Sequence, residues 1–263
     1  MKPSLTIIKV GGAVVEDEAQ LTQLLRDFTA IQGPKILVHG GGRRATKIAE
    51  RLGIETKMID GHRITDAEML EVVTMVYGGL VNKNGVARLQ ALGCNAIGLT
   101  GADANILLSQ KRPLKMVNGE PVDYGFVGDV KQASGSKIAH FIDADLIPVI
   151  APLTHDGQGH MLNTNADTMA SETAKAMAAV GFDVTLIYAF EKPGVLRDAD
   201  DDNSVIATIN HADFETYKAD GTISGGMLPK IENALAAIDA GVKRVIITKA
   251  TAIDGQHGTV ITK

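Results

Sequence analysis

The sequence predicts an α/β protein with a mostly parallel sheet. Short β-branched segments, most of them bounded by glycine, alternate with longer segments of helical period. The β-branched segments are apolar almost throughout, which is typical of strands buried on both faces. With 263 residues, 45% of them hydrophobic and 22% charged, the chain can bury the core of one large domain or of two lobes.

The order of the predicted elements supports this fold class. The predicted strands are 5–10, 36–39, 96–99, 146–150, 184–188 and 244–248. The predicted helices are 18–31, 44–52, 66–92, 167–180 and 228–240. Because strands that alternate with helices form βαβ units, their strands run parallel.

The longest predicted helix has clear ends and a weak middle. Thr65 or Asp66 can cap its N-terminus, and Gly93 can end it. The pair Gly78-Gly79 lies near its centre, where each glycine costs about 1 kcal/mol relative to alanine. We therefore expect a bend in this segment, or two helices.

Two stretches rich in Gly, Pro, Asn and Asp interrupt the alternation, at 110–137 and 154–164. Their composition predicts β-hairpins added to the α/β frame. If the chain forms two lobes, we expect the boundary near the helix that follows Asp167.

Composition excludes several classes of protein. The net charge is −5, and no basic segment with interleaved aromatic residues occurs, so we expect no nucleic-acid partner. No apolar stretch approaches the roughly 18 residues that span a bilayer, and the first apolar run is too short for a signal peptide. A single cysteine, Cys94, cannot form an intrachain disulfide. These features predict a cytoplasmic protein without a membrane partner.

Two glycine clusters follow predicted strands. Lys9 precedes Gly11 and Gly12, and the segment 39–42 (His-Gly-Gly-Gly) precedes Arg43. Ligands of parallel sheets bind at the carboxyl ends of strands, where glycine lets backbone N–H groups approach closely. A helix start after the second cluster also favours negative charge. We therefore expect a phosphate or carboxylate ligand, although an ordinary turn with a surface lysine would also explain the first cluster.

Familiar motifs of other enzymes are absent from the sequence. The His-Gly-Gly-Gly segment occurs in some hydrolases, but the chain has no G-x-S-x-G nucleophile motif. It also has neither G-x-x-x-x-G-K-[ST] nor G-x-G-x-x-G. Hydrolase, P-loop NTPase and dinucleotide-binding readings therefore lose their main support.

Three further motifs could bind ligand. Arg63, in the loop 60–66, could clamp a carboxylate with two parallel hydrogen bonds, although a surface salt bridge is the simpler reading. Asn163 and Asp167 stand at a helix start, where caps are common, but they could bind a polar ligand and orient lysines. Lys230 lies in the first turn of a helix, where a cation gains nothing from the helix dipole. That position favours a functional lysine.

We expect no resident metal site. His155 and His160 flank a predicted turn, but no Cys and His set completes a zinc site. The acidic segment 198–202 lacks the Gly and Glu of a calcium loop and is predicted to be a solvated turn.

Taken together, these motifs resemble those of the amino acid kinase family. The resemblance runs nearly end to end, through 9–12, 39–42, 61–66, 81–83, 98–103, 125–130, 163–167, 194–196, 225–230 and 258–260. It implies an open αβα sandwich with two lobes. Residues 1–178 would bind an acylated glutamate and dimerise, and residues 179–263 would bind ATP.

The resemblance also implies the chemistry. The γ-phosphoryl group of ATP, with Mg²⁺ bound through ATP, would pass to the side-chain carboxylate of N-acetyl-L-glutamate, a step of arginine biosynthesis. Preorganised cations and amides must meet the charge that develops on the transferred group. By the family's pattern Lys9 and Lys230 are these cations, and Asp167 orients them.

Binding residues carry over in the same way. The substrate would contact Gly41, Gly42, Arg63 and Asn163. The nucleotide would contact Gly11, Gly12, Glu191, Gly194, Leu196 and Ser224, with Gly11, Gly12 and Gly41 as N–H donors to the phosphates.

Two positions depart from the family's pattern. Glu191 stands where relatives usually have Asp, and Arg43 follows the glycines where Pro is common. Both departures bear on the nucleotide contacts. Arginine-inhibited relatives carry a helix ahead of the first strand that links dimers into hexamers, and Lys9 leaves no room for one. The resemblance therefore implies a homodimer insensitive to arginine.

Alternatives remain within and outside this enzyme class. N-succinyl-L-glutamate could replace N-acetyl-L-glutamate, since a few loop residues can decide the acyl group. Other family members act on aspartate, carbamate or nucleotide monophosphates, but the segments 61–66 and 81–83 favour acylglutamate. A non-catalytic sensor of arginine or nucleotide is a further alternative, although Lys9, Asp167 and Lys230 are all present.

Overall fold

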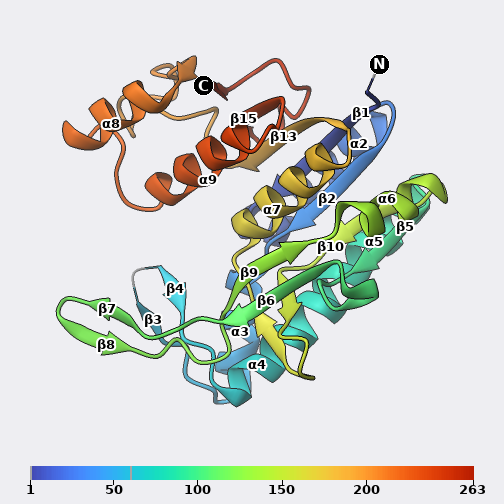
Figure 1. Cartoon of the computed structure of the whole chain (residues 1–263), viewed down its shortest axis with the longest axis vertical. Helices are drawn as coiled ribbons and strands as arrows, with labels where there is room; N and C mark the ends of the chain where they lie inside the picture. Colours follow the sequence, from blue (N-terminus) through green and yellow to red (C-terminus); the bar gives the residue numbers. More distant parts are fainter. Residues whose placement is uncertain (1, 60) are drawn as a thin grey trace.

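The computed structural model describes residues 2–59 and 61–263, and it forms an α/β fold around one large sheet (Figure 1). Asp60, part of the predicted loop 60–66, lies outside the described residues. The sheet has the strand order β14-β16-β15-β13-β1-β2-β10-β5. Its neighbouring strands pair in parallel, except that β15 and β16 are antiparallel. The predicted mostly parallel α/β class is confirmed.

The strands of this sheet include all those predicted from buried β-branched segments. Its members are β1 (Ser4–Val10), β2 (Lys35–His39), β5 (Ala96–Leu99), β10 (Ile147–Ile150), β13 (Asp183–Phe190), β14 (Thr208–Ile209), β15 (Arg244–Lys249) and β16 (Thr259–Ile261). Short β14 and β16 extend one edge and were not predicted. The remaining strands are β3 (Met58–Ile59), β4 (His62–Arg63), β6 (Leu107–Lys111), β7 (Lys115–Val117), β8 (Glu120–Val122), β9 (Gly128–Ala133), β11 (Leu153–His155) and β12 (Met161–Asn163).

Helices cover both faces of the central sheet. They are α1 (Gly12–Glu16), α2 (Glu18–Ala30), α3 (Gly42–Arg51), α4 (Ala67–Val73), η1 (Thr74–Val81), α5 (Asn82–Ala91), η2 (Asp103–Asn105), α6 (Gly135–Asp143), α7 (Ala166–Ala179), α8 (His211–Ala219) and α9 (Met227–Asp239). Successive residues of β1 point to opposite faces. Ile7 packs in one core cluster with Met169 of α7, whereas Ile8 packs in the other with Phe28 of α2. The predicted αβα sandwich is therefore confirmed.

The segment predicted as one long helix is continuous but not uniform. Asp66 caps it, since its side chain accepts a hydrogen bond from the N–H of Met69 at 2.9 Å. The glycine pair Gly78-Gly79 falls inside η1, a π-helical stretch between α4 and α5. Thus the weak middle produces a change of helix type rather than separate helices. Gly93, with φ of 82°, follows the end of α5.

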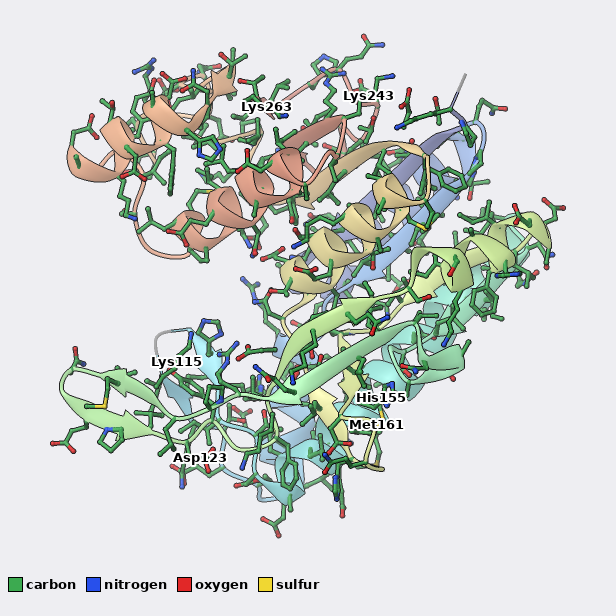
Figure 2. All side chains as sticks on the ribbon, in the orientation of Figure 1. Lys115, Asp123, His155, Met161, Lys243 and Lys263 are labelled. Atoms are coloured by element: carbon green, nitrogen blue, oxygen red, sulfur yellow. The ribbon has the colours of Figure 1, made fainter. Side chains whose placement is uncertain are left out.

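Hairpins and one unpredicted helix occupy the loop-rich stretches. In 154–164, β11 and β12 pair antiparallel with His155 opposite Met161, as predicted (Figure 2). In 110–137, β7 and β8 form an exposed hairpin between Lys115 and Val122, and β6 pairs antiparallel with β9. The prediction of hairpins over 110–137 is wrong for its last residues, because helix α6 begins at Gly135.

The sheet order reverses its direction at the first strand. From β1 the chain adds β2 on one side, and later it adds β13 on the other. Such a topological switch point is where open parallel sheets bind ligands, beyond the carboxyl ends of the strands. The ends of β1, β2 and β13 therefore bring both glycine clusters and the segment after Phe190 to one edge. None of the described helices is long and apolar enough to cross a membrane.

Candidate active site

Three predicted site residues from distant parts of the chain meet at this edge. Lys9 near the end of β1 places its Nζ 2.6 Å from Oδ1 of Asp167, in the first turn of α7. Lys230, in the first turn of α9, places its Nζ 2.7 Å from Oδ2 of the same carboxylate. One carboxylate thus holds two ammonium groups, one at each oxygen. This is the arrangement predicted for orienting the two lysines.

Burial and charge set the protonation of this cluster. Lys9 and Asp167 are each 8% exposed. Burial would raise the pKa of Asp167, but the charges of Lys9 and Lys230 outweigh it and hold that pKa at about 2. Burial lowers the pKa of Lys9, opposed by the attraction of Asp167. The cluster therefore carries one carboxylate against two ammonium groups when both lysines are protonated.

Local hydrogen bonds fix the position of Asp167. The side chain of Asn165 caps α7 by accepting from the N–H groups of Asp167 at 2.7 Å and Thr168 at 3.1 Å. Tyr188 of β13 donates its hydroxyl to the carbonyl oxygen of Asp167 at 3.3 Å. The helix start and the central sheet together hold this carboxylate before any ligand binds.

The glycine clusters lie against one another at the ends of β1 and β2. A Cβ on Gly12 would lie 3.7 Å from the backbone nitrogens of both Gly41 and Gly42. Gly41 precedes α3 and has no side chain to cap it, so the first N–H groups of this helix lack a side-chain partner from that position. The N–H of Gly11, by contrast, donates to the carbonyl of Ala189 at 3.1 Å. The expectation of a free donor at Gly11 is therefore corrected.

A buried polar network supports the second glycine cluster. The Nδ1–H of His39 donates to the carbonyl of Gly40 at 2.9 Å, because a carbonyl can only accept. Its Nε2 then accepts from Nδ2 of Asn82 at 3.1 Å, and Nδ2 also donates to the carbonyl of Val149 at 2.9 Å. The segment 81–83 thus ties the ends of β2 and β10 to the long helical run. Burial lowers the pKa of His39 to about 4, so it is neutral near pH 7.

All four predicted substrate-binding residues line one cavity of about 190 Å³. Its wall is formed by Gly40, Gly41, Gly42, Met58, Gly61, His62, Arg63, Tyr77, Arg112, Val127, Pro152, Asn163, Thr164, Asn165 and Ala166. Ala166, the last of these residues in the sequence, directly precedes Asp167. The cavity brings the motifs after β2, around β4 and before α7 together, as the resemblance implied.

Arg63 is rigidly held in this wall. Its Nη2 donates to the carbonyl of Gly42 and to Oγ1 of Thr46, both at 2.9 Å, and its Nη1 donates to Oγ1 of Thr56 at 3.2 Å. Asn163 in turn donates from Nδ2 to Oγ1 of Thr65 at 3.0 Å. Both predicted contacts with substrate stay predictions, but both side chains are fixed in place at the cavity.

Sequence reasoning missed Tyr77 and Arg112 as cavity residues. Tyr77 lies in the π-helical stretch η1, and a Cβ on Gly41 would come within 2.7 Å of its ring. Because π-helical turns are frequently functional, the glycine pair after Tyr77 was the available signal. Arg112 falls inside a stretch that composition marks only as hairpin, so no pattern in the sequence identifies it.

A second cavity, of about 170 Å³, gathers predicted nucleotide contacts. Its lining is Lys192, Gly194, Val195, Leu196, Ala199, Thr222, Ile223, Ser224 and Met227. Thr259 accepts from the N–H of Val195 at 2.8 Å and fixes this loop. A Cβ on Gly194 would lie 2.7 Å from Val205, so the loop also depends on that glycine.

Glu191 does not belong to this cavity lining. Its Oε1 lies 3.6 Å from Nη2 of Arg43, and both side chains are more than half exposed. The two departures from the family's pattern therefore face one another, one from the end of β13 and one from the start of α3. The predicted contact of Glu191 with the nucleotide therefore stays a prediction, and in this structure its carboxylate faces Arg43.

No cluster of His, Cys, Asp and Glu fit to hold a metal ion occurs within residues 2–59 and 61–263.

The two cavities lie on either side of the cluster formed by Lys9, Asp167 and Lys230. One cavity reaches Ala166, before Asp167, and the other reaches Met227, in the same helical turn as Lys230. A site with two glycine loops, two lysines and one orienting carboxylate suits transfer of an anionic group between two small molecules. Fold and site together define a small-molecule kinase.

Comparison with known proteins identifies the family. The sequence matches the amino acid kinase family over residues 4–249. The acetylglutamate kinases of Bacteroides fragilis and Bacteroides thetaiotaomicron are each 64% identical over 263 residues, covering all of this chain and 98% and 100% of those proteins. The crystal structure of smu.665 from Streptococcus mutans superposes with a TM-score of 0.78 at 29% identity, covering 98% of both chains. The chain belongs to the amino acid kinase family, as its motifs implied.

Proposed function

We propose that this kinase is an N-acetyl-L-glutamate kinase, which transfers the γ-phosphoryl group of ATP to the side-chain carboxylate and forms N-acetyl-L-glutamyl 5-phosphate. The ion pair between Lys230 and Asp167, 2.7 Å long, carries the proposal, because it joins the helix turns that border the two cavities. The names of relatives at 64% identity support this choice of substrate. In that role the enzyme serves arginine biosynthesis.

The lysine cluster provides electrostatic catalysis. Phosphoryl transfer to a carboxylate spreads negative charge over the transferred oxygens and the leaving ADP. Lys9 and Lys230 meet that charge, and Asp167 keeps both ammonium groups in place so that little reorganisation is needed. No side chain forms a covalent intermediate, since the substrate carboxylate attacks the phosphorus directly. Gly12 and Gly41 contribute backbone N–H donors beside the lysines.

The two substrates occupy the two cavities. The acylated glutamate lies between Gly41, Gly42, Arg63 and Asn163, with its α-carboxylate toward the charge of Arg63 and its side-chain carboxylate toward Lys9. The nucleotide lies beside Gly194, Leu196 and Ser224. Mg²⁺ enters as part of the ATP substrate and neutralises charge on its phosphates.

The proposed function also divides the chain into two lobes and includes a homodimer. Residues 1–178 hold the acylated glutamate and the contact between subunits, and residues 179–263 hold ATP. Met75 and Leu80 of η1 are 55% and 38% exposed, which supports a homodimer formed through the first lobe. The free, buried Cys94 supports a cytoplasmic location. Light scattering on the purified protein tests the dimer, and a monomer or hexamer would exclude it.

The decisive experiment measures ATP-dependent acyl phosphate, trapped with hydroxylamine. N-acetyl-L-glutamate, free L-glutamate and L-aspartate are compared at equal concentration. We expect hydroxamate from N-acetyl-L-glutamate alone among these three. Formation from aspartate or glutamate instead would assign the chain to another branch of the family, and no product from any of the three would refute N-acetyl-L-glutamate as the substrate.

A further inference from the structure

We infer that Tyr77 is a further substrate-binding residue of this kinase, and that its hydroxyl donates a hydrogen bond to the α-carboxylate of the acylated glutamate. This inference rests on the proposed function, because it concerns the amino-acid substrate of the same site. It goes beyond that function by dividing the recognition of one carboxylate between two side chains. Arg63 supplies positive charge, and Tyr77 supplies the directed donor.

Arg63 has already committed its terminal nitrogens to the protein. Nη2 donates to the carbonyl of Gly42 and to Oγ1 of Thr46, both at 2.9 Å. Nη1 donates to Oγ1 of Thr56 at 3.2 Å and to Sδ of Met69 at 3.8 Å. These contacts use all four N–H groups of the two terminal nitrogens. A two-point clamp on a carboxylate needs at least one of these nitrogens, so it would have to break a contact within the wall.

Tyr77 reaches the same part of the wall from the π-helical stretch η1. Its ring lies along Gly41, where a Cβ would come within 2.7 Å of Cδ1 and 3.0 Å of Cε1. A Cβ on Gly42 would lie 3.9 Å from both the hydroxyl oxygen of Tyr77 and Nη2 of Arg63. The hydroxyl therefore extends past Gly41 to the place where the guanidinium lies. All four residues line the cavity, and Tyr77 stays 4% exposed.

The apolar part of Tyr77 is held by the core. It belongs to a buried cluster that includes Ala45 of α3, Val73 of α4 and Ala151 after β10. A tyrosine can bury its ring in this way and keep its hydroxyl at a polar surface. The side chain is thus ordered before a ligand binds, which lowers the entropy cost of the contact.

The hydroxyl of Tyr77 is a donor near pH 7. Burial raises its pKa above the ordinary value of 10, although the charge of Arg63 and a side-chain hydrogen bond with it act in the opposite direction. Because a guanidinium can only donate, the oxygen of Tyr77 accepts that hydrogen bond. Its O–H proton is left for another acceptor.

The charge of the cavity identifies that acceptor. The described residues of the lining include no Asp or Glu, so no carboxylate of the lining competes for the proton. The acylated glutamate brings two carboxylates, and the one on its side chain is directed to Lys9. The α-carboxylate is the one beside Arg63, where Tyr77 meets it. Hydrogen bonds to ionised acceptors are roughly twice as strong as those between neutral groups.

Tyr77→Phe tests the contact, because it removes the hydroxyl and keeps the ring against Gly41. We expect the KM for N-acetyl-L-glutamate to rise by about tenfold or more, while kcat and the KM for ATP stay within about threefold. Initial rates with each substrate varied in turn measure these constants, and thermal unfolding checks that the fold is kept. Tyr124→Phe is the matched control, since it removes a hydroxyl from a tyrosine that is 2% exposed and absent from the cavity lining. It should leave the KM for N-acetyl-L-glutamate within about twofold.

A second substrate assigns the effect to the α-carboxylate. N-acetyl-L-isoglutamine carries an uncharged amide in place of that group and keeps the side-chain carboxylate that accepts the phosphoryl group. Tyr77→Phe should lower kcat/KM by about tenfold or more for N-acetyl-L-glutamate but by less than about threefold for this amide, because a neutral acceptor gains less from the hydroxyl. A change in packing alone would lower both values equally.

The outcomes separate this inference from the proposed function. If Tyr77→Phe keeps the KM for N-acetyl-L-glutamate within about twofold, the inference is overturned and the kinase assignment stands. If the variant lowers kcat/KM equally for the acid and its amide, Tyr77 acts by packing on Gly41, and the inference is again overturned. If the unaltered enzyme forms no acyl phosphate from N-acetyl-L-glutamate, the proposed function itself fails.

Discussion

The Nζ of Lys9 lies 2.6 Å from Oδ1 of Asp167, and both side chains are almost fully buried. A buried ion pair is seldom a net gain in stability, because two charges lose their hydration. Its position at the end of the central strand, with Lys230 on the other carboxylate oxygen, instead indicates a functional arrangement. Asp167 keeps two positive charges close together although they repel one another.

Replacing Asp167 with Asn should therefore disable catalysis more than binding. The amide has one acceptor oxygen, so it can hold one lysine but not both. We expect kcat to fall by about a hundredfold or more and KM for the acylated glutamate to change little. Steady-state kinetics measure both. An Asn variant with kcat within threefold of the unaltered enzyme would contradict the orienting role.

The same variant should change the dependence of activity on pH. Burial lowers the pKa of Lys9, and the nearby charge of Lys230 lowers it as well, whereas Asp167 raises it. Without the carboxylate, Lys9 loses its proton at lower pH, so the alkaline limb of the kcat profile should move toward acid. Asp167 itself, with a pKa of about 2, stays ionised across the measurable range and should produce no acid limb.

Removing either cation should be costly and specific to the site. Lys9→Met and Lys230→Met should each reduce kcat by about a hundredfold or more, because each deletes a donor to the transferring group. Lys243→Met is the matched control. Lys243 pairs with Asp183 at 2.8 Å at the opposite end of β13, where it is 62% exposed (Figure 2). Its loss should leave kcat unchanged and alter the free energy of unfolding by less than about 1 kcal/mol.

The two neighbouring cavity glycines should differ in their tolerance of a methyl group. A Cβ on Gly41 would lie 2.7 Å from the ring of Tyr77, whereas a Cβ on Gly42 has no neighbour closer than 3.9 Å. Gly41→Ala should lower the free energy of unfolding by about 1–3 kcal/mol, as overpacking does. Gly42→Ala should cost little, since alanine suits a helix start better than glycine does. Urea denaturation measures both, and equal losses would show that Tyr77 yields freely.

Neutral burial of His39 predicts a loss of stability in acid. Its pKa is lowered to about 4 in the folded protein, mainly by burial, whereas an unfolded chain has the ordinary value of 6.5. Protons therefore bind the unfolded chain first, so stability is full above about pH 6.5 and is lost as pH falls toward 4. The shift corresponds to roughly 3 kcal/mol at most.

A variant isolates this contribution from that of the carboxylates. His39→Gln keeps an amide near Asn82 but cannot be protonated in this range. The difference in free energy of unfolding between the two proteins should therefore change between pH 7 and pH 4, with the unaltered protein losing more. A difference that stays constant with pH would show that His39 does not titrate on unfolding.

An element of this fold can be predicted from the sequence when its own residues carry a pattern long enough to recognise. The strands of the sheet interior, such as β1 and β13, are buried on both faces, so their apolar segments identify them without further information. Short β14 and β16 at the edge contain two or three residues, which is below the length at which a pattern can be recognised. Helix α8 was missed although its start shows a capping box, in which Asn210 and Asp213 exchange hydrogen bonds.

The site was predictable to the extent that its residues lie in short motifs at strand ends and helix starts. Lys9 and Lys230 lie beside glycine pairs and Asp167 lies at a helix start, and the structure brings both lysines within hydrogen-bond distance of Asp167. Arg112 could not be found, because its place in the cavity depends on the pairing of β6 with β9 and on no local pattern. Glu191 was assigned to the nucleotide by analogy, but its charge is directed toward Arg43 instead.

The exposed pair of Glu191 with Arg43 and the cavity around Gly194 should respond differently to substitution. An exposed ion pair with a 3.6 Å separation contributes less than about 1 kcal/mol. Glu191→Ala should therefore change the free energy of unfolding by less than that amount and keep the KM for ATP within about threefold of the unaltered value. Gly194→Ala should behave differently, since its Cβ would lie 2.7 Å from Val205 and 2.9 Å from Oγ1 of Thr259.

Displacing Thr259 would release the N–H of Val195 and distort the wall of the cavity. We therefore expect Gly194→Ala to raise the KM for ATP by about tenfold and to leave the KM for the acylated glutamate unchanged, because the two cavities share no lining residue. Initial rates with each substrate varied in turn measure the two constants. A larger effect of Glu191→Ala than of Gly194→Ala on the KM for ATP would return Glu191 to the nucleotide site.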